Sequence, residues 1–131
     1  MRKDKLMTKE KLGINDFIRE CHHIAKEKGW WDEERNDGEL IALMHSELSE
    51  ALEEYRNGHA VDEVYFSGGA RDENGVWHEG KKPEGIPIEL ADVVIRMADF
   101  CGDMGIDLEQ AILTKMAFNE TRSYRHGGKV V

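Results

Sequence analysis

The chain has few of the features that mark the commonest special classes of protein. No apolar run approaches the about 18 residues that a membrane-spanning helix needs. The basic N-terminus lacks the apolar stretch of a signal peptide. Positive charge is also scarce, because 18 Lys and Arg stand against 27 Asp and Glu, for a net charge of -9. We therefore expect a cytoplasmic protein with no membrane partner, and the charge argues against nucleic acid as a partner.

Cysteine is equally scarce, with only Cys21 and Cys101. The two lie far apart and each falls on the apolar side of an expected helix, so we interpret them as reduced core thiols. The composition, 40% hydrophobic and 34% charged, fits one globular domain. We expect that domain to cover 1–131, with an N-terminal extension over 1–12, an insert over 57–86 and a mobile tail over 126–131.

Helical periodicity dominates the apolar pattern of the sequence, and strand signals are almost absent. Four amphipathic segments are bounded by capping residues: 14–28 with Asn15 as N-cap, 37–57 with Asp37 as N-cap, 87–105 with Pro87 in the first turn, and 107 to beyond 118 with Asp107 as N-cap. This pattern predicts an all-α fold, a four- to five-helix bundle.

The insert between the second and third helices holds six of the 13 glycines. Within it Val64-Tyr65-Phe66 and Val76-Trp77-His78 flank a Glu-Asn-Gly turn signal. The insert is therefore either a small β-hairpin or a Gly-rich, lid-like loop.

Acidic pairs at helical spacing occur in both helices beside the insert: Glu47 and Glu50 in one, Glu89 and Asp92 in the other. At about 100° per residue, each pair borders the apolar face at the same offset. Two such helices packed antiparallel would bring four carboxylates to one semi-buried seam. Oxygen ligands of this kind suit Mg²⁺, with Mn²⁺ as a second possibility.

Two neighbouring acids are weaker candidates for the same seam. Glu54 projects close to Glu47 on the helix, whereas Glu53 projects farther round and is expected to face solvent.

A basic face lies on the fourth helix, where Lys115, Asn119 and Arg122 recur at i, i+4 and i+7, with His126 following in the tail. Lys and Arg suit phosphate oxygens, so this face would complement a metal-bound polyphosphate. Aromatic rings at Trp30 and Trp31 could stack on a nucleobase or pack in the core.

Taken together and in order, these motifs resemble the MazG-like all-α NTP pyrophosphohydrolases, close to the dCTP pyrophosphatase and dimeric dUTPase branches. The similarity covers roughly residues 14 to 126, although the gap between the acidic pairs is longer than is typical. The resemblance implies Mg²⁺ coordination by Glu47, Glu50, Glu89 and Asp92, and phosphate or sugar contacts from Lys115, Asn119 and Arg122. It also implies that His22 and Trp31 line a base pocket and that the protein is a homodimer or homotetramer.

The function expected from these features is Mg²⁺-dependent cleavage of an NTP or dNTP to a monophosphate and pyrophosphate, in clearing the nucleotide pool. Either Glu47 or Glu50 would activate the attacking water. Alternatives are a non-catalytic nucleotide- or metal-binding module and phosphoribosyl-ATP pyrophosphatase. A di-iron carboxylate protein needs two Glu-x-x-His motifs, and the chain has only the one at Glu20 and His23.

Overall fold

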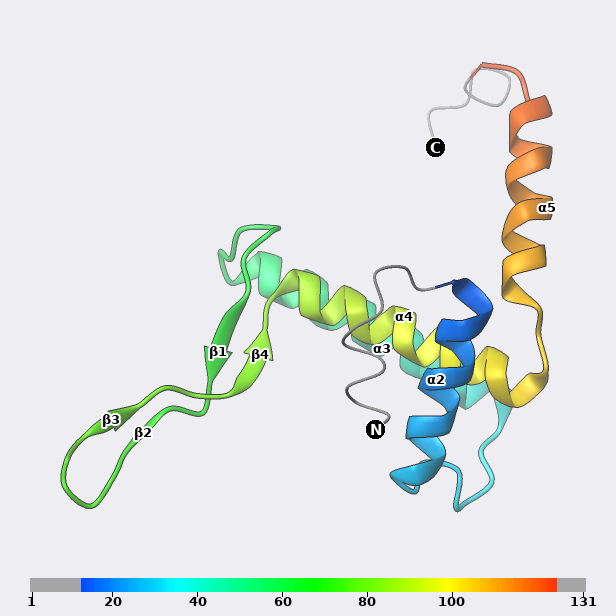
Figure 1. Cartoon of the computed structure of the whole chain (residues 1–131). Helices are drawn as coiled ribbons and strands as arrows, with labels where there is room; N and C mark the ends of the chain where they lie inside the picture. The colour runs from blue at the N-terminus through cyan, green and yellow to red at the C-terminus, as the bar shows by residue number, and fades with distance from the viewer. Residues whose placement is uncertain (1–12, 125–131) are drawn as a thin grey trace.

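The computed structural model describes residues 13–124, and these form four helices and four short strands (Figure 1). The expected N-terminal extension and tail lie outside the described residues. The helices are α2 (Ile14–Glu27), α3 (Asp37–Arg56), α4 (Ile86–Met104) and α5 (Leu108–Thr121). The strands are β1 (Tyr65–Ser67), β2 (Ala70–Arg71), β3 (Trp77–His78) and β4 (Lys82–Glu84). None of the described helices is both long and apolar enough to cross a membrane.

The helix boundaries agree closely with the capping signals, with two corrections. The N-cap of α3 is Asn36, whose side chain accepts a hydrogen bond from the Glu39 amide, so Asp37 is the first helical residue. Asn15 does not cap α2, because that helix already begins at Ile14. Its side-chain amide donates to Asp107 Oδ1 at 3.0 Å and so ties α2 to the start of α5. Asn15 therefore bonds through its polar side chain to the start of another helix instead of capping its own.

The core lies where α4 packs between α2 and α3. Its buried residues are Ile18, Ala98 and Cys101, with Phe17 and Cys21 packed against them. Both cysteines are free thiols, as predicted, and burial raises the pKa of Cys21 to about 11. The core is small because much of the apolar surface of the helices is not covered within one chain.

The insert is a β-hairpin arm, which decides between the two sequence interpretations. β1 pairs antiparallel with β4 in the register Phe66 to Pro83, and β2 pairs with β3 farther out. Asp72 closes the tip, because its side chain accepts hydrogen bonds from the Asn74 and Val76 amides. The arm extends away from the helices (Figure 1).

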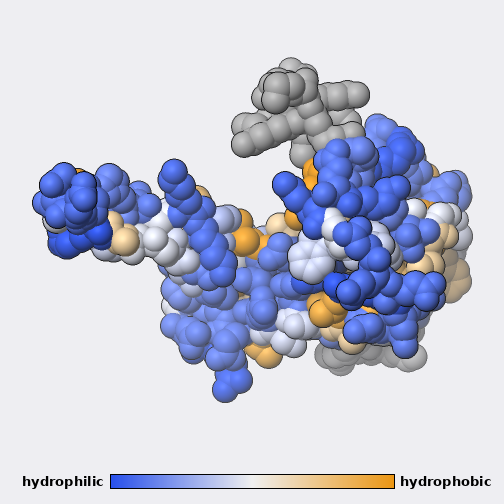
Figure 2. Space-filling view, turned by 90° about the horizontal axis from the view of Figure 1, so that it is seen from below, coloured by the Kyte–Doolittle hydropathy of each residue, from blue (hydrophilic) through white to orange (hydrophobic). Residues whose placement is uncertain are grey.

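α5 also extends away from the other helices (Figure 1) and packs mainly against α2. None of its residues is buried, and Leu113, Met116 and Phe118 are each more than half exposed. Apolar patches between polar side chains are visible on the face shown in Figure 2. The mostly helical fold with a hairpin insert is confirmed, and within residues 13–124 α4 packs against α2 and α3 while α5 packs mainly against α2.

Candidate functional site

The acidic residues of α3 and α4 form the candidate metal site. The hairpin arm joins the end of α3 to the start of α4, so the two helices run antiparallel and side by side (Figure 1). Glu47, Glu50 and Glu89 each place a carboxylate oxygen within 4.8 Å of those of the other two. We call these three residues the carboxylate cluster. The structure thus brings together three of the four carboxylates predicted from sequence, and it does so across two helices.

Glu89 is the member of the cluster with a buried carboxylate oxygen. Its Oε2 atom is buried and has no hydrogen-bond partner among the residues that the structure describes. Burial, together with a hydrogen bond to Glu50 and the charges of Glu50, Asp92 and Glu47, raises the pKa of Glu89 to about 7. An unpartnered buried carboxylate oxygen among other carboxylates is the environment that a hard divalent cation would relieve. The cluster could therefore hold a metal ion.

Asp92 lies one turn after Glu89 and belongs to the edge of the cluster. Burial and the charge of Glu47 raise its pKa, while Arg96 and Lys82 lower it. Asp92 also lines the same pocket as Glu47. It can therefore take part in binding a cation from the pocket side of the cluster.

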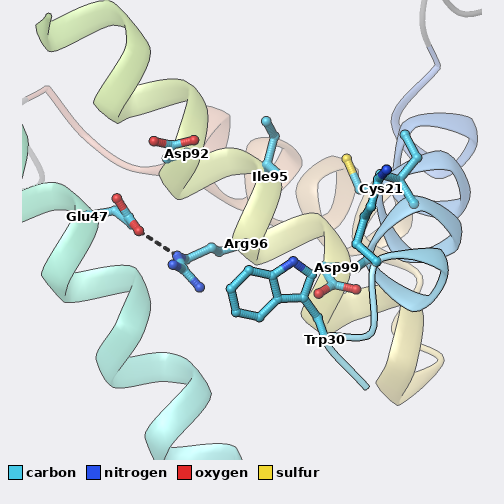
Figure 3. A pocket seen from close by; sticks show the side chains of 10 residues that line it. Cys21, Trp30, Glu47, Asp92, Ile95, Arg96 and Asp99 are labelled. Carbon is cyan, nitrogen blue, oxygen red and sulfur yellow. Dashed lines mark hydrogen bonds and ion pairs between the residues drawn. The ribbon is translucent and has the colours of Figure 1, made fainter. Parts of the chain in front are cut away.

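This pocket has a volume of about 300 Å³. Glu47, Asp92 and Arg96 line one end of it, and Trp30, Asp99 and aliphatic side chains from α2 and α4 line the other (Figure 3). Arg96 Nε donates to Glu47 Oε1 at 2.7 Å. Trp30, rather than Trp31, is the tryptophan of this pocket.

His22 and Trp31 meet at a residue that sequence reasoning missed. Asp99 Oδ1 accepts hydrogen bonds from His22 Nδ1 and from Trp31 Nε1, both at 2.8 Å. The two rings also meet edge to face with centroids 5.5 Å apart. The signal for Asp99 was present in the sequence, because Asp92, Arg96 and Asp99 recur at i, i+4 and i+7 on one face of α4. These two aromatic residues are held together beside the pocket, which Asp99 also lines.

The basic face of α5 lies apart from the carboxylate cluster within one chain. Lys115 Nζ lies 5.0 Å from the centroid of the Phe118 ring, and the Arg122 guanidinium lies 5.6 Å from it. No α5 residue, Asn119 included, lines the pocket of Glu47 and Asp92. Contacts of Lys115, Asn119 and Arg122 with a phosphate therefore stay a prediction.

Glu54 is used in the structure to anchor the hairpin arm. Tyr65 Oη donates to both Glu54 oxygens, at 2.9 and 2.8 Å, and the His59 ring stacks on the Tyr65 ring with centroids 4.5 Å apart. Because its oxygens already have these partners, Glu54 is committed to the base of the arm rather than to the carboxylate cluster.

Of the other two weaker candidates, Glu53 is exposed and forms an ion pair with Arg56 at 3.6 Å, in agreement with the solvent-facing position expected for it. His126 lies outside the described residues.

The chain matches no protein-family model, no curated protein and no solved structure.

Proposed function

We propose that the protein is a Mg²⁺-dependent nucleoside triphosphate pyrophosphohydrolase, which cleaves an NTP or dNTP between its α and β phosphates. The observation that carries the proposal is the carboxylate cluster of Glu47, Glu50 and Glu89, with a buried Glu89 oxygen that lacks a partner among residues 13–124. The resemblance of the motif order to MazG-like enzymes supports the same reaction.

The pocket beside the cluster supports a nucleotide as the substrate. One end holds Asp92 and Arg96 next to Glu47, and the other end offers the indole of Trp30 (Figure 3). A nucleotide matches this arrangement, because its base stacks on aromatic rings and its phosphates bind cations. The polyphosphate would lie over the carboxylates and the base against Trp30.

The reaction needs no covalent intermediate. Divalent cations held by Glu47, Glu50, Glu89 and Asp92 would offset phosphate charge and lower the pKa of the attacking water. Glu50, which is exposed at the edge of the cluster, would orient that water or accept its proton, and Glu47 is the second candidate for this role.

The test is release of pyrophosphate from a panel of canonical and modified NTPs and dNTPs in the presence of Mg²⁺. Glu50→Gln and Asp92→Asn should each lower turnover by about 100-fold or more while the circular dichroism spectrum stays unchanged. Glu53→Gln removes the same charge from an exposed position of α3 and should leave turnover unchanged. A protein that binds Mg²⁺ and nucleotide but releases no pyrophosphate from any triphosphate would be a binding module.

We also propose that the active unit is a homodimer or homotetramer. On α3, Leu48, Leu52 and Tyr55 are at least half exposed and line a shallow apolar groove that extends to Ile86 at the start of α4. A second copy would cover this surface, and α5 of that copy would carry its basic face toward the carboxylate cluster.

Complementation distinguishes a shared site from a self-contained one. Glu50→Gln and Lys115→Met should each inactivate the protein when pure, and sedimentation should give more than one chain per particle. If each site combines carboxylates of one copy with α5 of another, mixing and reassembling the two variants as dimers should restore about a quarter of the wild-type activity. No recovery from chains shown to exchange would contradict the shared site.

A further inference from the structure

Arg96 is a charged residue of the pocket that lies outside the carboxylate cluster and contacts one of its members. It enters from α4 and reaches across to α3, where its Nε donates to Glu47 Oε1 at 2.7 Å (Figure 3). The ion pair is partly shielded from water, because the Arg96 side chain is 34% exposed and that of Glu47 is 12% exposed.

The Arg96 guanidinium uses only part of its capacity in this contact. It carries five N–H donors, and the bond to Glu47 uses the one on Nε. Its terminal amino groups have no hydrogen-bond partner among residues 13–124. A planar group with free paired donors beside a pocket suits the oxygens of a phosphate better than it suits one carboxylate oxygen.

The ion pair also opposes cation binding. Glu47 belongs to the carboxylate cluster, so a divalent cation there must compete with a positive charge already in contact with one of its ligands. Once the cation holds Glu47, the two positive charges repel each other, which favours a further anion beside the guanidinium in addition to Asp92 and Asp99, which line the same pocket. The phosphates of a bound nucleotide would be the nearest anions that arrive with the cation.

We infer that Arg96 is a phosphate-binding residue that pairs with Glu47 in the cation-free protein and turns to the polyphosphate when a divalent cation takes Glu47. This inference rests on the proposed function, since it names a residue that contacts the substrate of that site. Arg96 thus links cation binding to phosphate binding, because a cation at Glu47 frees the guanidinium to turn to a phosphate.

The inference predicts opposite effects of one substitution on two ligands. In Arg96→Gln, the dissociation constant for Mn²⁺ alone should fall about three- to tenfold, because a competing and repelling charge has been removed. At saturating Mn²⁺, the dissociation constant for imidodiphosphate, a non-hydrolysable analogue of pyrophosphate, should rise about tenfold or more. Both are measured by calorimetry on the full chain.

Two further variants separate this role from general effects of charge or folding. Arg96→Lys keeps the charge but not the fork, so its Mn²⁺ affinity should stay near wild type while imidodiphosphate binds more weakly. Arg56→Gln breaks an exposed ion pair on α3 and should change neither constant by more than about twofold. Thermal unfolding of each variant checks that the chain is folded.

The outcomes separate this inference from the proposed function. If Arg96→Gln weakens Mn²⁺ and imidodiphosphate together, or behaves like Arg56→Gln, the role of Arg96 is wrong even in a protein that releases pyrophosphate. If the wild type releases none, the proposed function fails, while tighter Mn²⁺ binding and weaker imidodiphosphate binding in Arg96→Gln would still support an Arg96 that exchanges Glu47 for a phosphate.

Discussion

The protonation of Glu89 should make the cation-free protein less stable at alkaline than at weakly acidic pH. Its pKa is about 7 in the folded chain, against an ordinary value of 4.5. The folded chain therefore binds more protons than the unfolded chain between these two values. The free energy of unfolding must fall as the pH rises through this window, and Glu89→Gln should remove that loss because glutamine does not ionise.

The size of the effect follows from the shift in pKa. At 1.36 kcal/mol per unit, the difference sets an upper limit of about 3 kcal/mol. Glu89 is only partly buried, and solvent screening reduces the expected value to about 1–2 kcal/mol. Without a divalent cation, Glu89→Gln should therefore exceed the wild type in stability by about 1–2 kcal/mol near pH 8, and the difference should vanish near pH 4.

Urea denaturation followed by circular dichroism measures this difference, with EDTA in one series and excess Mg²⁺ in the other. Mg²⁺ should reverse the order of the two proteins near pH 8, because it binds the intact carboxylate cluster more tightly than the variant. Glu53→Gln makes the same change in net charge at an exposed residue and serves as the control. If Glu89→Gln is no more stable than this control near pH 8 without Mg²⁺, the inference that the ionised Glu89 carboxylate destabilises the folded chain is refuted.

Three other substitutions test the surroundings of the site. Asp99→Asn replaces the carboxylate that accepts both hydrogen bonds. It should lower the free energy of unfolding by about 1–2 kcal/mol and shift the tryptophan fluorescence spectrum. A Cβ at Gly102 would lie 2.5 Å from His22 Cβ, so Gly102→Ala should cost about 1–2 kcal/mol despite its higher helix propensity, seen as a lower melting temperature. Tyr65→Phe removes the bond to Glu54 and should speed amide hydrogen exchange in the hairpin arm, with little change in the helices. An unchanged exchange rate there would show that Glu54 does not anchor the arm.

Local features of the fold could be read directly from the residues. The Glu-Asn-Gly turn marked the hairpin tip, Pro87 marked the first turn of α4, and Asp107 proved to be the N-cap of α5, accepting from the Gln110 amide at 3.0 Å. Such signals act within one helical turn or one hairpin, so they can be predicted from the sequence without the tertiary structure. Two signals were read wrongly: Asp37 is the first residue of α3 and not its cap, and Asn15 bonds to Asp107, which is distant in sequence.

The sequence by itself determined that the acids of α3 and α4 lie at one offset on their helices, because helical spacing fixes which side chains share a face. Only the tertiary structure decided which of them meet. The packing of two helices depends on side chains along their whole contact, and it placed Glu89 inside the cluster, Asp92 at its edge and Arg96 on Glu47. It also separated the basic face of α5 from these carboxylates, since no local signal states how far one helix stands from another.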